Sequence, residues 1–547
     1  MAKIRNYADA VYHVKRGFLV IGLTGRTGSG CSTALRLLTR PEKPKIPGYD
    51  AISSGEPPVR DERIYAKLKR EWESLNWDRF VPIEVSKLIF ALTVDRALRS
   101  RRKTETLEVI RRITATDKQR FFALRYLRKP HKLNKKTSGG LIKAYELCRS
   151  LYITFKKKTG KDLGDFIELM QNLGDEIRKF GWVSPSKDMK PSPENLFILP
   201  EAIRRVIKAY RIAENASHFV IDAFRNPYEV EFFKWRYSEF YLVAILRDVK
   251  ERYGGLRSLT ENSLKKLENR EAGGAIERRR DNIADWITSQ DLEACFQKGD
   301  MFVKNVMDST KTYPHLRFNL IKLITLVKNP GCVPPTTDER CMQIAMTARQ
   351  MSGCIARQVG AAVVNKDRYC VGVGWNESPQ GQVSCSLRTG KELVDSPSKE
   401  IFSDFERSAK FVKHIRENCY TDRPFCFRSE LPLALGRPGD KMAEFTRALH
   451  AEENALSQAT RNTGRTLDEG VLYTTASTCT LCAKKAYQLG ISRIVYIEEY
   501  SGIGVEQTIK TGDRQIEISR FQGVTGSAYF QLFGSLMPEK DLIRLYL

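Results

Sequence analysis

Short apolar runs, each bounded by glycine or polar residues, alternate along this chain with longer stretches of helical periodicity. The short runs have the length of buried strands and occur at residues 18–23, 218–222, 359–364, 369–374, 471–475 and 491–497. Apolar residues at helical spacing, such as Leu88, Leu92 and Val94, occur in residues 85–165. The pattern therefore predicts an α/β protein with a helical addition at residues 85–165.

Proline and glycine between residues 327 and 335 separate two regions of the chain. Such residues are typical of a linker, and 547 residues are enough for two or three domains. We therefore place a boundary near residue 330 and predict one domain at residues 1–330 and a second at residues 331–547. The lysine-rich stretch 132–140 predicts a mobile loop within the first domain.

Nearly all of the net charge of +26 lies in the first domain. From Gly331 onward, 27 Lys and Arg nearly balance 25 Asp and Glu, so the first domain alone carries +24. A positive excess of this size could bind the phosphates of RNA or DNA, or it could belong to solvated helices. The densest basic stretches lie at residues 99–103, 125–136, 156–161 and 278–280.

Two short motifs of the second domain supply three candidate metal ligands and one proton carrier. His450 is followed at a distance of two residues by Glu452, and Cys479 and Cys482 form a CxxC pair downstream. One His and two Cys can fill three corners of a tetrahedral zinc site and leave the fourth for water. Glu452 would then move protons without binding the metal, which is the signature of a zinc-dependent hydrolytic deaminase of a nucleobase.

A closed zinc knuckle, or a buried cysteine pair with an unrelated histidine, is the structural alternative. The upstream position of the HxE motif and the presence of one CxxC favour the catalytic zinc. Thr478 stands where deaminases usually have proline. Cys385, His414, Cys419 and Cys426 lie between residues 381 and 450, but their spacings match no knuckle, so buried thiols are favoured there over a second, structural zinc.

A glycine-rich loop follows the first predicted strand and has the spacing of a phosphate-binding P-loop. Its lysine position is occupied by Cys31, so the usual cation for the β and γ phosphates is missing. Asp222 ends the strand at residues 218–222, as a magnesium-binding acid would. The residues assigned to a nucleotide, with Mg²⁺ as a possible companion, are Gly25, Gly28, Gly30, Ser32, Thr33 and Asp222.

These loop and strand motifs, with residues 223–227 and 171–179, resemble the P-loop nucleotide and coenzyme kinases. The resemblance implies a parallel sheet with helical additions. Because Cys31 replaces the lysine, we favour a kinase-like domain that binds nucleotide for control over an active kinase.

The second domain resembles the cytidine deaminase superfamily, and within it the deoxycytidylate deaminases. The resemblance is carried by residues 352–357 and 374–381 together with the HxE and CxxC motifs. It implies a three-layer α/β/α fold in which Asn376 contacts the sugar of the substrate and Arg357 lies near its phosphate or at the sheet edge. A turn residue is the structural alternative for Asn376.

The whole chain resembles the bacterial anti-phage deoxycytidine nucleotide deaminases, which join such a kinase-like domain to such a deaminase-like domain. The resemblance implies conversion of dCTP, dCMP or both to the uracil forms and depletion of the dCTP pool. It also implies control by the first domain, in some members through a small RNA, and a homo-oligomer.

Two other functions fit part of the sequence. A deaminase of RNA or single-stranded DNA could use the basic first domain as its guide, and a nucleotide-binding or RNA-binding regulator could carry a vestigial deaminase. The intact His450, Glu452, Cys479 and Cys482 set argues against the regulator, and residues 376–381 favour a free nucleotide. The apolar run at residues 17–24 is too short to span a membrane, and twelve cysteines without regular spacing predict reduced thiols, so we expect a cytoplasmic protein without a membrane partner.

Overall fold

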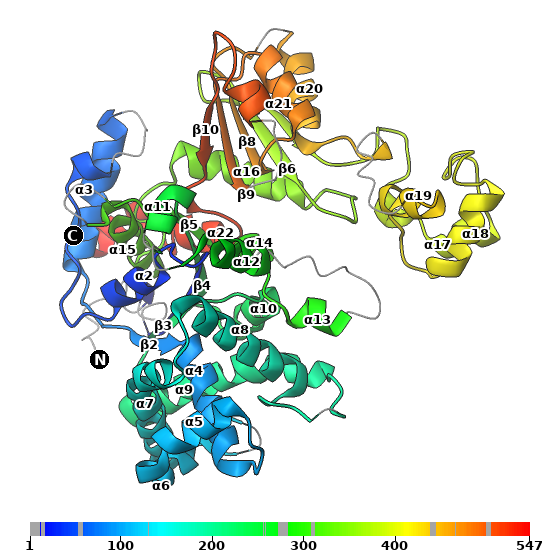
Figure 1. The fold of residues 1–547 in the computed structure, drawn as a ribbon. Coiled ribbons are helices and arrows are strands. Elements are labelled where there is room, and N and C mark those ends of the chain that lie inside the picture. Colours follow the sequence, from blue (N-terminus) through cyan, green and yellow to red (C-terminus); the bar gives the residue numbers. More distant parts are fainter. Residues whose placement is uncertain are drawn as a thin grey trace. The chain divides into compact units, whose positions relative to one another are not determined.

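The computed structural model divides the chain into two compact units (Figure 1). The first unit comprises Met1–Pro334 and Ser527–Leu547, and the second comprises Pro335–Gly526. The structure describes residues 11–12, 17–52, 58–128, 131–186, 188–254, 256, 259–271, 283–307, 312–437, 445–464, 467–498 and 505–546.

Five parallel strands form the sheet of the first unit, in the order β5-β4-β1-β3-β2. The central strands consist of buried apolar residues because helices cover both faces of a parallel sheet. The strand bounds are β1 Leu19–Thr24, β2 Val81–Glu84, β3 His218–Asp222, β4 Phe240–Leu246 and β5 Met301–Lys304.

Sixteen helices among the described residues belong to the first unit. They are α2 Cys31–Leu38, α3 Pro58–Ser74, α4 Val85–Arg99, α5 Glu105–Ile113, α6 Lys118–Phe121, α7 Lys135–Lys158, α8 Leu163–Phe180, α9 Ile198–Glu214, α10 Pro227–Arg236, α11 Val249–Gly254, α12 Glu261–Glu271, α13 Ile283–Thr288, α14 Leu292–Phe296, α15 Pro314–Lys328, α22 Ser527–Phe533 and α23 Glu539–Tyr546.

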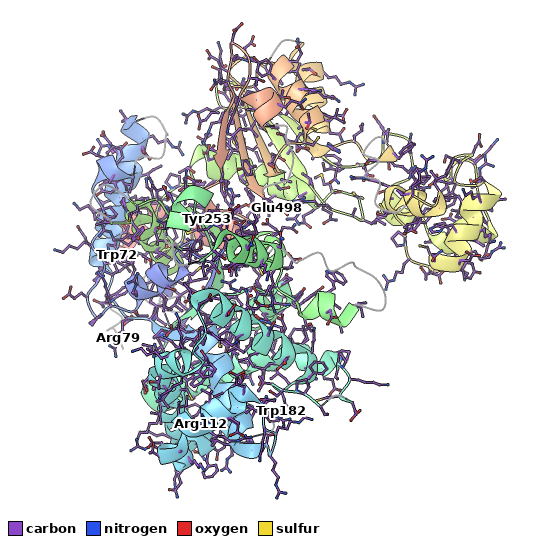
Figure 2. The ribbon with its side chains drawn as sticks, in the orientation of Figure 1. Trp72, Arg79, Arg112, Trp182, Tyr253 and Glu498 are labelled. Atoms are coloured by element: carbon purple, nitrogen blue, oxygen red, sulfur yellow. The ribbon has the colours of Figure 1, made fainter. Side chains whose placement is uncertain are left out.

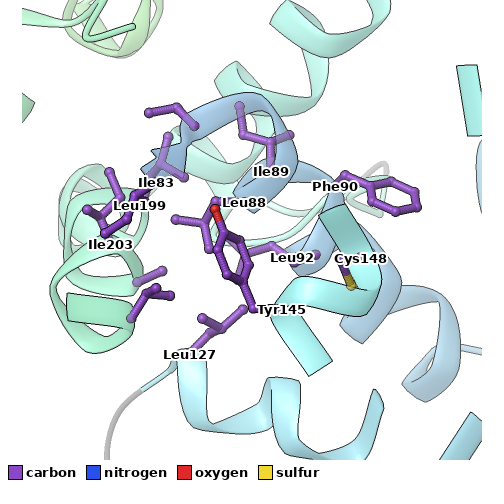
Figure 3. Close-up of a cluster of buried hydrophobic side chains, with 14 of the residues drawn as sticks. Ile83, Leu88, Ile89, Phe90, Leu92, Leu127, Tyr145, Cys148, Leu199 and Ile203 are labelled. Carbon is purple, nitrogen blue, oxygen red and sulfur yellow. The ribbon is translucent and has the colours of Figure 1, made fainter. Parts of the chain in front are cut away.

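The helical addition predicted at residues 85–165 forms one apolar core with the sheet. Tyr145 of α7 is fully buried and lies between Leu88 of α4 and Leu127 (Figure 3). Its hydroxyl accepts a hydrogen bond from the backbone N–H of Glu84 at 3.3 Å, so α7 is tied to the end of β2. The addition is therefore an integral part of the unit.

The prediction of a mobile loop at residues 132–140 is wrong for residues 135–140, because α7 begins at Lys135. Asn134 accepts a hydrogen bond from the backbone N–H of Thr137, and the Thr137 hydroxyl accepts one from the backbone N–H of Asn134. This capping box satisfies two backbone groups at the helix start. Local capping therefore outweighs the lysine-rich composition.

The second unit contains a five-stranded mixed sheet in the order β10-β9-β8-β6-β7. Strand β6 is antiparallel to both β7 and β8, whereas β8, β9 and β10 run parallel. The bounds are β6 Gly360–Val364, β7 Cys370–Trp375, β8 Val471–Ala476, β9 Arg493–Glu498 and β10 Glu517–Arg520; the short strand β11, Gly523–Val524, is not part of this sheet. The helices are α16 Thr337–Arg349, α17 Gly390–Asp395, α18 Ala409–Asn418, α19 Phe427–Ala434, α20 Ala451–Thr463 and α21 Thr480–Gln488.

Helices lie on both faces of this sheet (Figure 1). Ala361 and Leu472 pack with apolar residues of α20 and α21 on one face. Side chains alternate along a strand, so Tyr473 points to the opposite face, where its hydroxyl donates to Asp338 of α16 at 2.7 Å. The second unit therefore has three layers, α16, the sheet, and α20 with α21.

Two glycines of β7 allow α20 to approach the sheet at backbone distance. A Cβ atom at Gly372 would lie 2.3 Å from the carbonyl oxygen of Ala455, and one at Gly374 would lie 2.2 Å from that of Ala451. Both carbonyls belong to α20. No other residue type fits at these positions without displacing the helix.

Residues between β7 and α20 form a subdomain with its own small core. Phe402, Phe411 and Phe425 are buried there together with apolar residues of α17, α18 and α19. The guanidinium of Arg388 is buried against the carboxylate of Glu406 and lies 4.8 Å from the centre of the Phe402 ring. This segment between β7 and α20, called the insertion below, thus has a core of its own.

The C-terminal helices α22 and α23 belong to the first compact unit, whereas the sequence analysis assigned residues 331–547 to one domain. The backbone N–H of Gly331 donates to the carbonyl of Leu532, and Lys322 of α15 lies over the ring of Phe533. The apolar face of α22 therefore packs on α15. No helix in the described part of the chain is long and apolar enough to cross a membrane.

The substitution Gly374→Ala tests the close packing of α20. The added methyl group must displace backbone atoms of α20, so we expect a loss of about 1–3 kcal/mol in the free energy of unfolding, measured by urea denaturation. Gly139→Ala in α7 is the matched control, because nothing lies within 4 Å of its added Cβ. Equal stability of the Gly374→Ala variant and the unchanged protein would contradict the packing.

Candidate active site

His450, Cys479 and Cys482 converge on one point of the second unit. The Nδ1 atom of His450 lies 3.3 Å from the Sγ atom of Cys479 and 3.4 Å from that of Cys482. All three ligand atoms lie within 4.8 Å of one another. The three residues that the sequence predicts as metal ligands therefore lie together in the structure.

Local structure fixes the backbone of each of these residues. His450 is the N-cap of α20, and Cys479 is the N-cap of α21, directly after the turn that follows β8. The backbone N–H of Leu449 donates to the carbonyl of Glu377 at 2.9 Å, and Asn454 donates from its side chain to the carbonyl of Trp375 at 2.7 Å. The start of α20 is thus tied to the end of β7 by two hydrogen bonds.

A hydrogen bond links the two cysteines and shifts their pKa values in opposite directions. The hydrogen bond with Cys482 lowers the pKa of Cys479 to about 3, and the same bond together with burial raises the pKa of Cys482. The hydrogen bond with Cys479 also raises the pKa of His450. A metal ion can replace the proton of the hydrogen bond between the cysteines, because cysteine binds metals as the thiolate.

The donor set fits zinc in type and in spacing. A tetrahedral ion with Zn–S near 2.3 Å and Zn–N near 2.0 Å would separate nitrogen and sulfur ligands by about 3.5 Å, close to the separations from His450. Among the described residues, His450, Cys479 and Cys482 are the group of three His, Cys, Asp or Glu side chains that could hold an ion. Cys385, Cys419, Cys426 and His414 form no such group, and His414 instead lies 2.8 Å from Glu430.

Glu452 lies beside the cluster in the first turn of α20. It is 4% exposed, and its Oε2 atom lies 4.0 Å from the Sγ atom of Cys482. Burial raises the pKa of its carboxyl to about 7. A carboxyl that titrates near neutral pH can both accept and release a proton.

The cluster opens into a cavity of about 310 Å³. This volume is at the lower end of the range for small-molecule sites. Its wall comes from the turn after α16, the end of β7, the starts of α20 and α21, and the insertion. His450, Cys479 and Glu452 line the cavity together with Cys354, Ala356, Arg357, Val359, Asn376, Arg428, Thr446, Ala448, Ala451, Ala476, Ser477, Thr480 and Leu481.

Asn376 lines the cavity, but its side chain also holds the cavity wall together. Its oxygen accepts hydrogen bonds from the hydroxyl of Ser352 and the backbone N–H of Val359, at 2.8 and 2.7 Å. Its nitrogen donates to the carbonyl of Arg357 at 2.7 Å. The structural role of Asn376 is therefore confirmed, whereas its contact with the sugar, for which one N–H remains, stays a prediction.

Arg357 also lines the cavity, and an acid of the sheet orients it. Its guanidinium lies 2.5 Å from the carboxylate of Glu498, the last residue of β9, which Figure 2 labels. The side chain is 32% exposed. The ion pair places Arg357 at the end of β9, whereas its place near a substrate phosphate stays a prediction.

Two residues of the wall were not singled out from the sequence. Arg428, in the first turn of α19, adds a second guanidinium to the cavity. The hydroxyl of Thr446 is buried without a hydrogen-bond partner among the described residues. Both lie in the insertion, and only its position immediately before His450 could have drawn attention to them.

The glycine-rich loop of the first unit joins β1 to the start of α2. Gly30 has φ 112°, and a Cβ there would lie 2.0 Å from the side-chain nitrogen of Asn305, which donates to the carbonyl of Ser29 at 2.7 Å. Ser32 donates from its hydroxyl to Asp222 at 3.5 Å. The loop and the strand end thus meet as the sequence predicted.

The chemistry around this loop differs from that of a metal site. Burial raises the pKa of Cys31 to about 12, so its thiol is neutral, and burial raises the pKa of Asp222 to about 6. Around the loop, the described residues contain no cluster of three metal-binding side chains, so the predicted Mg²⁺ has no support there. The six predicted residues, Gly25, Gly28, Gly30, Ser32, Thr33 and Asp222, all line a single cavity.

Many side chains of the basic stretches serve the first unit itself. Arg99 pairs with Asp95, Arg102 donates to the carbonyl of Ser184, and Arg128 stacks 3.5 Å from the ring centre of Trp182, which Figure 2 labels. The stretch 278–280 lies outside the described residues. Part of the +24 charge therefore has internal contacts and is not available to a polyanion.

Comparison with known proteins identifies the second unit. Residues 335–498 match the cytidine and deoxycytidylate deaminase zinc-binding region. The chain is 32% identical over 161 residues to the deoxycytidylate deaminase of Enterobacteria phage T4, covering 29% of this chain and 76% of that protein. It is 30% identical over 165 residues to the deoxycytidylate deaminase of Mycobacterium phage D29, covering 30% of this chain and 97% of that protein.

A crystal structure of the dCMP deaminase from cyanophage S-TIM5 in complex with dCMP and dUMP also matches, with 22% identity and a TM-score of 0.22, over 35% of this chain and 99% of that chain. The family match contains all four residues of the clustered site, and two phage relatives are at least 30% identical over most of their own length. The chain therefore belongs to the cytidine and deoxycytidylate deaminase family.

Proposed function

We propose that this chain is a zinc-dependent hydrolase that deaminates deoxycytidine nucleotides, dCMP, dCTP or both, to the uracil forms. The observation that carries the proposal is the meeting of His450, Cys479 and Cys482 beside a buried Glu452 at the floor of a cavity. The relatives that match this unit are deoxycytidylate deaminases. The proposal that the substrate is a deoxycytidine nucleotide rests on the similarity to these relatives.

The residues of the site divide the chemistry between them. A zinc ion held by His450, Cys479 and Cys482 would supply a Lewis acid that makes water reactive at neutral pH. Glu452 accepts a first proton from the attacking water and passes it to ring nitrogen 3, and it then transfers the remaining proton of the C4 hydroxyl to the departing amino group, which leaves as ammonia. The C4–N bond breaks, a C4–O bond forms, and one water yields one ammonia.

Charged side chains of the cavity support a substrate with phosphate. Arg357 and Arg428 both line it, and arginine binds phosphate through a fork of N–H groups. The remaining N–H of Asn376 can donate to the sugar. These groups favour a free nucleotide and do not distinguish one phosphate from three.

We further propose that the first unit binds a nucleotide and controls the deaminase without acting as a kinase. The P-loop spacing, the position of the loop at the end of central strand β1, and Asp222 at the end of adjacent β3 support nucleotide binding, because ligands of open parallel sheets bind beyond the carboxyl ends of the strands. The neutral thiol of Cys31 in place of lysine argues against phosphoryl transfer. A regulatory RNA on the basic surface, a homo-oligomer and a role in anti-phage defence are parts of the same proposal that rest on resemblance alone.

Removal of Glu452 should separate metal binding from turnover. Glu452→Ala keeps all three ligands, so we expect zinc content to stay near that of the unchanged protein while the deamination rate falls by at least about 10³-fold. Cys479→Ala removes a ligand and should lose both zinc and activity, as measured by metal analysis and ammonia release. A near-normal rate in the Glu452→Ala variant would refute the proton-carrier role.

The substrate class is tested by ammonia release from dCMP, dCTP, cytidine, single-stranded DNA and RNA. We expect turnover of one or both deoxynucleotides and little turnover of the nucleoside or the polymers. Turnover of the polymers alone would instead support a polynucleotide deaminase guided by the basic unit.

The kinase-like unit is tested by nucleotide binding and by transfer of the γ-phosphate of ATP to deoxynucleotides. Because Cys31 is neutral, we expect binding without transfer, and Cys31→Lys provides the matched variant that restores the missing cation. Rapid phosphorylation of any deoxynucleotide by the unchanged protein would overturn the regulatory assignment.

A further inference from the structure

A second cavity, of about 460 Å³, lies in the first unit and takes no part in the proposed deamination. The glycine-rich loop forms its polar end. Tyr152, Phe166 and Met170 contribute to an apolar side. A polar end built from backbone N–H groups and an aromatic wall together match a phosphorylated aromatic base.

A carboxylate of the protein already contacts two residues of this polar end, Thr27 and Arg225. The carboxylate of Glu271, the last residue of α12, accepts hydrogen bonds from the backbone N–H of Thr27 at 3.1 and 3.3 Å and from the Thr27 hydroxyl. The guanidinium of Arg225 donates to the same carboxylate and, at 2.9 Å, to the Thr27 hydroxyl. One loop amide, one hydroxyl and one arginine therefore surround a single carboxylate.

This set of donors is the kind that binds a phosphate group. Phosphate oxygens are recognised by backbone N–H groups at the start of a helix and by arginine forks. The Glu271 side chain is only 1% exposed, so its charge depends on these partners for compensation. A phosphate placed on Thr27 and Arg225 would offer both residues the same charge and the same acceptors.

Arg225 provides a positive charge in the cavity where Cys31 replaces the lysine of a P-loop. The thiol of Cys31 is neutral, so the loop itself lacks the cation that a P-loop normally carries. Arg225 lines the cavity together with Cys31 and is 20% exposed, but in this structure Glu271 neutralises it. Its charge becomes available to a ligand only when the carboxylate leaves.

We propose that Glu271 is an internal substitute for a phosphate of a nucleotide that binds this cavity, and that Arg225, once released, contacts that phosphate in place of the P-loop lysine. The inference deepens the proposed nucleotide site of the first unit and is independent of the deaminase. Glu271 then occupies Thr27 and Arg225, and a ligand can contact these two residues only when α12 is displaced.

The packing of α12 is compatible with such a displacement. Leu267 and Glu271 are the side chains of α12 that are buried. A cavity of about 340 Å³ lies between α12 and α8, lined on the two sides by residues such as Ser263 and Gly164. Arg270 pairs with Asp175 of α8 at 2.7 Å, and Glu268 pairs with the buried Arg252 of α11, so the helix is held largely by polar contacts. Few apolar contacts must therefore be broken to move the helix.

The test is calorimetric titration of the full-length chain with inorganic pyrophosphate and with ATP. Glu271→Gln keeps the size of the side chain but removes its charge, so we expect the dissociation constants for both probes to fall on the order of tenfold. Glu261→Gln removes the same charge from the exposed first turn of α12 and should change neither constant. Addition of Arg225→Ala to Glu271→Gln should abolish the gain.

Each outcome decides one claim. Binding that is unchanged or weaker in Glu271→Gln, while the unchanged protein binds both probes, would overturn the role of Glu271 and leave the nucleotide site standing. Binding by neither protein would reject the nucleotide site itself, with no bearing on deamination. If Glu271→Gln does not fold, Glu271→Asp, which draws the carboxylate back from Thr27, must show tighter binding of both probes for the inference to hold.

Discussion

The close approach of α20 to β7 is the constraint on which the deaminase site depends. Because Gly372 and Gly374 have no side chains, the helix backbone rests directly on the strand. That contact sets the position of the first turn of α20, where His450 and Glu452 lie two residues apart. Cys479 and Cys482 come to the same point from the start of α21, after β8. One helix supplies the histidine and the acid, and the other supplies both thiols.

The sequence was sufficient to predict the residues of the cluster because the HxE and CxxC spacings each place their side chains within one helical turn. The same reasoning located the loop of the first unit and Asp222. It could not show that Asn376 has three partners within the protein, since Ser352, Val359 and Arg357 are brought to it only by the folded chain. The hydrogen-bond partners of a side chain depend on tertiary structure, and motif spacing does not reveal them.

Composition was less informative than local motifs. The lysine-rich segment that predicted a loop begins a helix at Lys135, because Asn134 and Thr137 cap it. The final helices pack with the first unit through Leu532 and Phe533, contacts that a linker near residue 330 gave no reason to expect. Part of the positive charge is likewise used within the fold, as Arg128 on Trp182 illustrates.

The central claim is that His450, Cys479 and Cys482 hold a zinc ion with one position left for water. X-ray absorption spectroscopy of the purified full-length chain at the zinc edge tests it most directly. For this site we expect one zinc per chain with two sulfur ligands near 2.3 Å and two lighter nitrogen or oxygen ligands near 2.0 Å. A shell of four sulfurs, or purified protein that deaminates without bound zinc, would contradict it.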